Sequence, residues 1–487
     1  MKKLVLIVGI VVFSLWVTAC PTGANLDFID EAPSLAYIWG EHFPLGNIIS
    51  PGYSRARMAL LSRHFDILTA ENHMKPDHVQ PSRGSFNFAT GQTLISDANR
   101  AGIGRFHGHT LAWHSQSPWH LNQQPPPQGS NFGPPIGRDE AIENLRYHID
   151  RTMRAFPSVE SWDVLNEIFS SGGGSVPEGG NWRNNLRMFP GPPPGSPPGT
   201  LGPQGPGTPW ARAIGTFPHN THDPNRYCYI WISFMQARRT AYAMGRPDMI
   251  LYYNDYNEEQ PGKREAIFFM VRDMNAEFAR RFPTGQYGST RLIDAIGMQA
   301  HYHRAAIVEL GENNNRPPNH GNLFPVQYPW ATNIPNVRAA LLRFAELDGV
   351  LISITELDIT VGNAGIGNFT PRHEREQAIT YARVFNFFHE FAAANPGRLR
   401  RVSIWGLDDP SSWRWRGSPV LFDGNFRPKE AFWAVAAPDA FVDPVTGVQR
   451  SEADINAFLA DPRAATREDG TLFIPEGAWE PGSPRRP

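Results

Sequence analysis

The sequence lacks the features that mark several large classes of protein. Lysine and arginine number 45 against 47 aspartates and glutamates, so the formal net charge is only −2. A chain so evenly charged has no basic surface of the kind that holds nucleic acid, and no acidic field that would steer a cation. Cysteine is scarce, with Cys20 and Cys228 alone among 487 residues. No internal repeat and no separate binding module are visible.

Long hydrophobic runs are also missing, except at the N-terminus. There, Lys2 and Lys3 precede an apolar stretch, residues 4–17, that is too short for a membrane-spanning helix. A short charged segment followed by such a stretch is typical of an export signal. The stretch ends in Val17-Thr-Ala-Cys20, which resembles the lipobox of bacterial lipoproteins.

The lipobox resemblance implies a signal peptide over 1–19, a lipidated Cys20 and a tether over 20–34. The protein would then be exported and held on a membrane of the bacterial envelope or surface, because several acyl chains anchor a protein stably. An uncleaved anchor, or an ordinary signal that yields a secreted protein, is the alternative. Lipidation would leave Cys228 alone and so exclude an intrachain disulfide.

After the tether, apolar runs of strand length alternate with amphipathic helical stretches. Eight strands are predicted, at 43–48, 65–70, 105–113, 159–166, 249–255, 292–299, 351–360 and 401–407. Helices are predicted between them, among others at 138–156, 228–244, 262–282, 337–347 and 372–394. This α/β alternation favours a closed parallel barrel, the (β/α)8 or TIM barrel, as a single domain over 35–440. A doubly wound sheet is the alternative, but no glycine-rich phosphate-binding turn follows the first strand.

Two segments do not belong to a minimal barrel. Residues 170–209 are rich in glycine and proline, and we expect an irregular loop that cannot bury a core. This loop follows the fourth strand, so it leaves the barrel on the face where barrel enzymes place their active sites. Residues 441–487 follow the last barrel helix and are predicted to be a polar extension with one weak helix.

Seven of the eight predicted strands run into a polar or aromatic cluster at their C-terminal ends. These clusters occupy 70–72, 107–114, 162–167, 254–257, 299–301, 355–358 and 405–409. In a parallel barrel these ends converge on one pocket. One polar strand end is ordinary, whereas seven of them together predict a functional site.

Two carboxylates in this ring suit the hydrolysis of a glycosidic bond. One carboxylic acid protonates the leaving oxygen, and one carboxylate attacks the anomeric carbon. Glu167 on the fourth strand and Glu356 on the seventh are far apart in the chain, so only the fold can join them. Asn166 is placed to hold a sugar hydroxyl. Asp358, on the same strand face as Glu356, is placed to orient a histidine and keep the nucleophile ionised.

The strand-end motifs resemble those of a known family. They are Thr69-Ala-Glu-Asn-His-Met-Lys75, His109-Thr-Leu-Ala-Trp-His-Ser-Gln116, Trp162-Asp-Val-Leu-Asn-Glu167, Tyr253-Asn-Asp-Tyr-Asn257, Gly297-Met-Gln-Ala-His301, Ile354-Thr-Glu-Leu-Asp358 and the stretch from Trp405 to Trp413. In this order, across roughly 43–437, they resemble glycoside hydrolase family 10, the xylanases. The glycine- and proline-rich segment departs from the family core, which puts the number of sugar subsites and the product length in doubt.

This resemblance implies an endo-1,4-β-xylanase that cleaves internal bonds of xylan with retention, through a covalent xylosyl-enzyme. It implies Glu167 as acid/base and Glu356 as nucleophile. It also implies that His301 and Asp358 tune the nucleophile, and that Asn166 binds the 2-hydroxyl of the attacked sugar. The further substrate-binding residues that it implies are Glu71, Asn72, Lys75, His109, Trp113, Gln116, Tyr256, Gln299, Trp405 and Trp413. The two last tryptophans would be aromatic walls, and crowding by Trp413 would favour xylose. We expect xylan and xylo-oligosaccharides as partners, a monomer, and neither metal nor cofactor.

Three alternatives stay open. The pairs His107/His109 and His301/His303 are spaced like metal ligands in hydrolases of amides and esters, although those enzymes carry the pair on the first strand. A surface lipoprotein that only captures xylo-oligosaccharides would use the same ring of side chains, but binding alone gives no reason for two such glutamates. The third alternative is an enzyme for another polymer, such as mannan or β-glucan.

Overall fold

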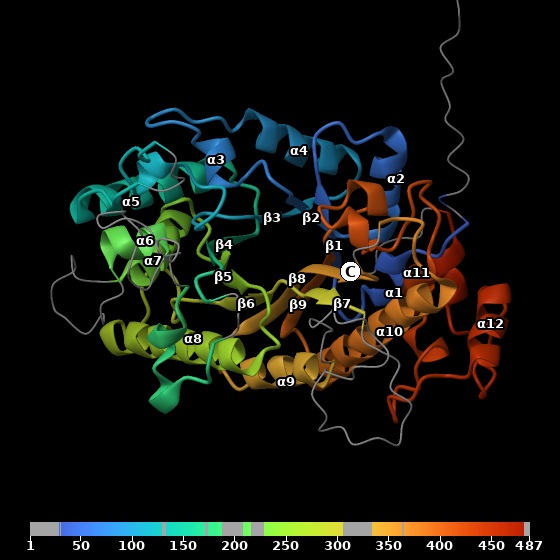
Figure 1. Cartoon of the computed structure of the whole chain (residues 1–487). Helices are drawn as coiled ribbons and strands as arrows, with labels where there is room; N and C mark the ends of the chain where they lie inside the picture. The colour runs from blue at the N-terminus through green and yellow to red at the C-terminus, as the bar shows by residue number, and fades with distance from the viewer. Residues whose placement is uncertain are drawn as a thin grey trace, which may run out of the picture.

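The strands of the chain form one closed parallel barrel. The computed structural model describes residue 29 and residues 31–128, 133–170, 174–187, 208–215, 228–304, 334–362 and 365–481. The barrel strands are β1 (Leu45–Ile49), β2 (Ile67–Ala70), β3 (Arg105–Gly108), β4 (Ser161–Asn166), β5 (Ile250–Asp255), β6 (Ala295–Met298), β8 (Leu351–Thr360) and β9 (Leu399–Ile404). Each pairs in parallel with the next, and β9 pairs with β1 to close the ring (Figure 1). The predicted (β/α)8 barrel is confirmed.

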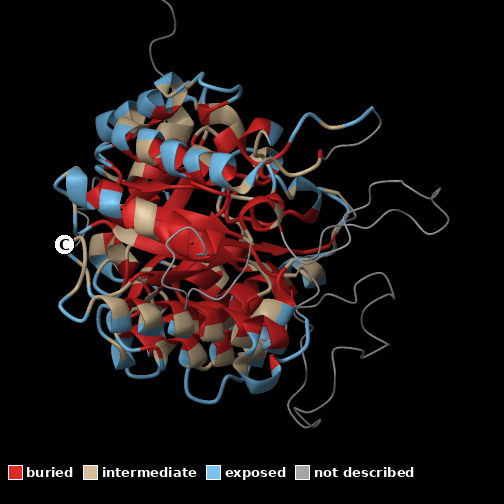
Figure 2. Cartoon of the chain, turned by 90° about the vertical axis from the view of Figure 1, so that its left-hand side faces the viewer, coloured by how far each residue is buried: buried red, intermediate tan, exposed pale blue. Residues whose placement is uncertain are grey.

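Helices surround the strands. They are α1 (Leu35–Trp39), α2 (Arg55–His64), α3 (Pro76–Val79), α4 (Ala89–Arg100), α5 (Arg138–Ala155), α6 (Pro209–Ile214), α7 (Tyr229–Ala243), α8 (Pro261–Arg281), α9 (Ile334–Ala345), α10 (Pro371–Ala394), α11 (Glu430–Ala436) and α12 (Glu452–Ala460). In α5, the buried residues Ala141, Leu145 and Ile149 recur every four positions and form the buried stripe of an amphipathic helix. Figure 2 shows buried strands at the centre and exposed residues on the outer faces of the helices. None of the helices in the described part of the chain is both long and apolar enough to span a bilayer.

Close packing of neighbouring strands depends on a glycine in β3. A Cβ added to Gly108 would lie 2.3 Å from the ring of Trp162 on β4, far inside van der Waals contact. Trp162 itself is fully buried. The absence of a side chain at Gly108 therefore lets the largest side chain of β4 fill the space beside β3.

The sixth predicted strand, 292–299, contains β6, and a further strand that was not predicted follows it. β6 ends at Met298, and a second strand, β7 (His301–His303), follows after Ala300, which has a positive φ of 61°. β7 pairs with the outer half of β8, where His301 lies opposite Asp358. Because β8 runs on past the barrel rim, Glu356 and Asp358 stand at the mouth of the barrel beside His301.

The glycine- and proline-rich segment is partly folded. Residues 174–187 contain two 3-10 turns, η3 (Glu178–Gly180) and η4 (Trp182–Asn185). Trp182 is fully buried against Phe169, and its ring nitrogen donates to Asp273 of α8 at 3.1 Å. The expectation that this segment cannot bury a core is wrong for this part, because one large aromatic side chain anchors it. The other residues of the segment, 171–173 and 188–207, lie outside the described residues, as do the predicted signal peptide and Cys20.

The C-terminal extension packs on the barrel. It contains the one predicted helix, α12, which buries Ile455 and Phe458. A final turn, η9 (Glu476–Trp479), contacts α1, and Arg63 of α2 donates to the carbonyls of Ala478 and Glu480 at 3.2 and 2.6 Å. The extension is more than polar surface: a few well-placed apolar side chains tie it to the N-terminal helices.

Candidate active site

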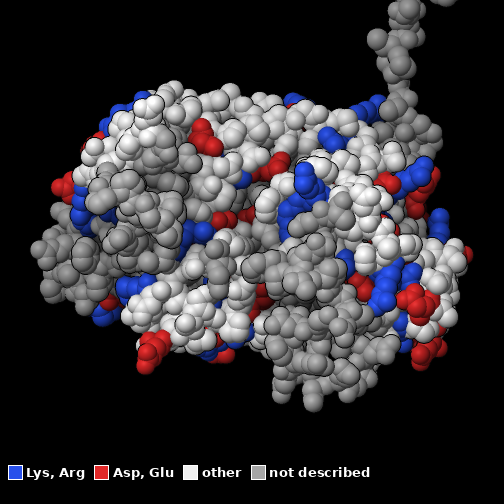
Figure 3. All heavy atoms as spheres, viewed as in Figure 1, with Lys and Arg blue, Asp and Glu red and all other residues white. Residues whose placement is uncertain are grey.

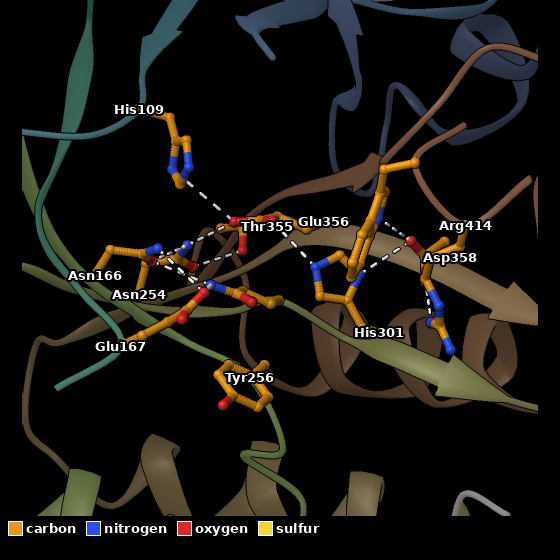
Figure 4. A network of polar contacts seen from close by, with 12 residues as sticks. His109, Asn166, Glu167, Asn254, Tyr256, His301, Thr355, Glu356, Asp358 and Arg414 are labelled. Atoms are coloured by element: carbon orange, nitrogen blue, oxygen red, sulfur yellow. Dashed lines mark hydrogen bonds and ion pairs between the residues drawn. The ribbon is translucent and has the colours of Figure 1, made fainter. Parts of the chain in front are cut away.

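A short chain of amides connects the two candidate carboxylates. Asn254, at the end of β5, donates from Nδ2 to Oε1 of Glu356 at 2.8 Å and to Oδ1 of Asn166 at 3.0 Å. Gln299, after β6, donates from Nε2 to that same Asn166 oxygen and to Oε1 of Glu167, both at 3.1 Å. Glu167 and Glu356 therefore line one site at the carboxyl ends of the strands (Figure 4). The predicted convergence of these strand ends on one pocket is confirmed.

Asn254 is the centre of this network, and its surroundings leave it one orientation. Its Oδ1 accepts a hydrogen bond from Oγ1 of Thr355 at 2.7 Å, so its amide nitrogen must face Asn166 and Glu356. A Cβ at Gly297 would lie 2.3 Å from that same Oδ1 and 2.9 Å from Cγ2 of Thr355. Glycine at 297 therefore makes room for the side chain that bridges the site.

The environment of Glu167 favours its protonated form. Burial raises the pKa of Glu167, and the nearby Asp255 raises it further. The hydrogen bond from Gln299 and the charge of Arg187 act in the opposite direction, but the pKa stays above its ordinary value. Glu167 has a φ of 56°, a backbone conformation that is uncommon for a residue with a side chain and is frequent at functional sites. A carboxyl group held in this way suits a general acid.

The environment of Glu356 favours the ionised form. Burial alone would raise the pKa of Glu356, but the hydrogen bond from His301 and the charges of His109 and His301 hold it below its ordinary value. Nε2 of His301 lies 3.1 Å from Oε2 of Glu356. Burial alone would lower the pKa of His301, yet Asp358 and Glu356 raise it to about 10. A cationic imidazole thus holds the carboxylate ready for attack.

Asp358 fixes the other side of His301. Its Oδ2 accepts from Nδ1 of His301 and from the ring nitrogen of Trp413, each at 3.0 Å, and its Oδ1 accepts from Arg414. Burial alone would raise the pKa of Asp358, but Arg414 and His301 together hold it below its ordinary value. Trp413 stands edge to face with His301, and more than half of its side chain is exposed, so one ring face is free to contact a ligand.

His109 forms the opposite wall of the site. Its Nδ1 lies 2.8 Å from Oδ2 of Asp163 in β4 and 3.9 Å from Oε1 of Glu356. The buried ring of Trp405 packs edge to face against His109. His109 therefore links the barrel interior to the carboxylate and to an aromatic ring, whereas the resemblance implied only a substrate contact for it.

The predicted glycone-side residues form a second polar cluster. Nζ of Lys75 donates to Oδ1 of Asn72 at 2.9 Å and to Oε1 of Gln116 at 2.8 Å, and it lies over the ring of Trp113. Oε2 of Glu71 accepts a hydrogen bond from Oγ of Ser50 at 2.6 Å. Burial lowers the pKa of Lys75 although several carboxylates oppose this effect. Lys75, Asn72 and Gln116 thus hold one another in one polar cluster beside the ring of Trp113.

In the described residues, one set of three side chains has ligand atoms close enough together for a metal ion. It consists of His109, Asp163 and Glu356, whose atoms lie within 4.8 Å of one another. The His-x-His pairs do not supply such a set there, since Nδ1 of His107 contacts Ser161 at 2.8 Å, and His303 contacts Arg414. Nδ1 of His109 is hydrogen-bonded to Oδ2 of Asp163 within this set, at 2.8 Å.

Several residues of the site were missed at the sequence level. Asn254 stood in a recognised cluster, but nothing in the motif marked it as the bridge. Arg414 follows a predicted tryptophan and reaches back to Asp358. Arg187 lies in the glycine- and proline-rich segment, yet it forms an ion pair with Oε2 of Glu167 at 3.5 Å and donates to Tyr256 at 3.0 Å.

The comparison with known families agrees with this geometry. Residues 34–438 match glycosyl hydrolase family 10. The chain belongs to this family. It is therefore a glycoside hydrolase whose catalytic unit is a single (β/α)8 barrel, with its site at the carboxyl ends of the strands.

Curated relatives and solved structures extend over most of this family 10 chain. An endo-1,4-beta-xylanase of Geobacillus stearothermophilus is 29% identical over 420 residues, which cover 83% of this chain and 98% of the relative. A thermostable celloxylanase of Thermoclostridium stercorarium is 27% identical over 428 residues, which cover 84% of this chain and 88% of the relative. An intracellular xylanase of Thermoanaerobacterium saccharolyticum, solved as a mutant with xylotetraose, is 26% identical with a TM-score of 0.59, covering 83% of this chain and 99% of that one.

Proposed function

We propose that the protein is a retaining endo-1,4-β-xylanase that hydrolyses internal β-1,4-xylosidic bonds of xylan. The observation that carries the proposal is that two carboxyl groups, connected by a chain of amide hydrogen bonds, have pKa values shifted in opposite directions. Burial raises the pKa of Glu167, whereas the contact with His301 keeps the pKa of Glu356 low. At neutral pH one group is thus biased to give a proton and the other to attack, which is the division of labour in glycoside hydrolysis. The names of the relatives support xylan as the substrate.

In the first step, Glu356 attacks the anomeric carbon of the sugar whose bond is to break. Glu167 gives its proton to the glycosidic oxygen, and the shortened chain leaves as an alcohol. The result is a covalent ester between Glu356 and xylose. In the second step, Glu167, now ionised, takes a proton from water. The resulting hydroxide attacks the anomeric carbon, releases Glu356 as a carboxylate and leaves the product with its original β configuration.

The other side chains bind and orient the sugar in this scheme. Asn166 donates to Oε1 of Glu167 at 3.3 Å and is joined to Glu356 through Asn254, so it can bind the 2-hydroxyl of the attacked xylose. Lys75, Asn72 and Gln116 bind hydroxyl groups on the glycone side, and Trp405 and Trp413 supply aromatic walls. In the free enzyme His301 is charged at neutral pH, because Asp358 and Glu356 raise its pKa to about 10 against the effect of burial.

The decisive experiment is hydrolysis of xylan by the purified protein, with chromatography of the products and proton NMR of the first-formed anomer. We expect xylo-oligosaccharides and an initial β product. Parallel incubations with mannan and β-glucan test the other polymers, and the celloxylanase relative makes an aryl cellobioside a useful further substrate. An initial α product would rule out retention, and absence of cleavage would leave only carbohydrate capture. Full activity after exhaustive chelation would exclude metal-dependent hydrolysis.

We also propose that the enzyme is a monomer exported as a lipoprotein through Cys20, with the catalytic domain at 35–440. The support for export is the lipobox-like sequence at 17–20. In cells fed a labelled fatty acid, the wild-type protein should carry the label and sediment with membranes. Cys20→Ala should carry no label and should not sediment with membranes. A wild-type protein without label would contradict the anchor, and sedimentation equilibrium of the purified domain tests the monomer.

A further inference from the structure

Arg187 makes three contacts around the candidate acid/base. Its Nε donates to the backbone carbonyl of Glu167 at 3.1 Å, and its Nη2 donates to the hydroxyl of Tyr256 at 3.0 Å. The same Nη2 lies 3.5 Å from Oε2 of Glu167. Only 18% of the Arg187 side chain is exposed. The guanidinium thus holds both the unusual backbone of Glu167 and its carboxyl group.

The contact is built into the fold. Arg187 is the last described residue of the folded part of the glycine- and proline-rich segment, 174–187. Its backbone nitrogen donates to the carbonyl of Ile168 at 2.8 Å, and Phe169 forms an isolated bridge with Leu186. Two short antiparallel stretches therefore carry Arg187 back to the end of β4. Buried Trp182 anchors the same segment to α8, so the position of Arg187 does not depend on one contact.

The charges that face Glu167 come from four directions. Asp255 on β5 is fully buried and raises the pKa of Glu167, although it is paired with Lys263 at 2.7 Å. Glu356 on β8 raises it too, while Arg187 lowers it. Nε2 of His114 lies 4.0 Å from Oε2 of Glu167, and this ring is neutral near pH 7 because burial, Arg187 and Lys263 lower its pKa to about 3. In the described part of the chain, Arg187 is thus the permanently charged cation paired with this carboxyl.

We propose that Arg187 is a positioning residue that balances the two protonation states of Glu167, so that one carboxyl group serves as acid and then as base. This inference rests on the proposed retaining mechanism. Glu167 must hold a proton for the first step and must be ionised for the second. When Glu356 becomes an ester it loses its charge, which removes one influence that favours the protonated form. Arg187 keeps its charge in both steps and stabilises the ionised form that accepts a proton from water.

The test compares Arg187→Met, which removes the charge, with Arg187→Lys, which keeps it but loses the two-sided hydrogen bonding. Loss of the cation raises the pKa of Glu167. For Arg187→Met, the alkaline limb of kcat/KM on xylohexaose should therefore move up by about one pH unit. The second step limits turnover of a substrate with a good leaving group, such as a dinitrophenyl xylobioside. With this substrate, the acidic limb of kcat should also move up in Arg187→Met, because Glu167 must be ionised to accept a proton in the second step.

Arg187→Lys should lose activity without moving either limb by more than a few tenths of a unit. Arg154→Gln, which breaks an exposed pair with Asp150 on α5, is the matched control and should leave both limbs in place. If Arg187→Met fails to fold, Arg187→Gln carries the same test. Uniform loss of activity with unmoved limbs in the uncharged variants, or a shift in Arg187→Lys as large as theirs, would overturn the inference. A retaining wild-type enzyme would leave the proposed function standing in that case.

Discussion

Nε2 of His301 lies 3.1 Å from Oε2 of Glu356, close enough for a charged imidazole to donate a hydrogen bond to the carboxylate. The other ring nitrogen is held by Asp358 at 3.0 Å, so the ring cannot turn away. A residue of β7 thereby controls the ionisation of a residue of β8, and the pairing of these two strands sets the distance between them.

Replacing His301 by Asn should shift the acidic limb of the pH profile. Loss of the imidazolium removes a hydrogen bond and a positive charge that keep the pKa of Glu356 low. The acidic limb of kcat/KM, which follows ionisation of Glu356, should then move up by about one pH unit or more. The measurement is kcat/KM on xylohexaose across pH. An unchanged acidic limb would mean that His301 does not tune the nucleophile.

Glu167→Ala should nearly abolish cleavage of xylan but spare the first step on aryl xylosides with good leaving groups, which need no proton. The loss on xylan should be on the order of 10²–10⁴-fold, the usual contribution of general acid catalysis. Azide should restore turnover of the aryl substrate and yield a β-xylosyl azide, seen by NMR. Equal losses on both substrates without azide rescue would contradict the assignment of Glu167.

Glu356→Ala should remove activity on every substrate, because no covalent intermediate can form without the nucleophile. Xylan and an activated aryl xyloside should both show rates at the limit of detection. Rapid-quench mass spectrometry of the wild-type enzyme with a slow fluorinated substrate should place the added sugar on Glu356. Labelling of another carboxylate would refute this role.

Gly297→Ala should damage the site and the fold together. The added Cβ would lie 2.3 Å from Oδ1 of Asn254, so the bridging amide must move. We expect a loss of about 1–3 kcal/mol in the free energy of unfolding and a lower kcat. Gly104→Ala is the matched control, since a Cβ there meets nothing within 4 Å, and it should change stability by less than about 0.5 kcal/mol. Urea unfolding that gives equal values for the two variants would disprove the close approach.

Trp479→Ala should destabilise the barrel although it lies in the C-terminal extension. The ring is buried and stacks on Trp433 of α11 with centroids 6.1 Å apart. Truncation should cost about 3 kcal/mol. Val445→Ala, in the same extension but almost fully exposed, should be neutral. A melting temperature unaffected by Trp479→Ala would show that the extension does not support the barrel.

The strand ends could be predicted because a parallel barrel strand is buried on both faces and is therefore a continuous apolar run. In 250–255 the run Ile-Leu-Tyr-Tyr gives way to Asn254 and Asp255 where the site begins. Arg187 could not be predicted in the same way. It stands among glycines and prolines with no periodicity, and its position depends on how Trp182 anchors the segment. The packing of the C-terminal extension was missed for a similar reason, since isolated apolar residues such as Ile455 and Trp479 form no pattern.

The order of strands and helices, and the presence of Glu167 and Glu356 at two strand ends, are local properties, so the amino-acid sequence alone determined them. Which of the two glutamates favours a proton was decided only in three dimensions. The pKa of each depends on burial and on charges a few ångströms away, and these charges belong to residues such as Asp255, Arg187 and His301. Electrostatic interactions fall with distance in space and not with separation along the chain, so the folded barrel alone sets the two ionisation states.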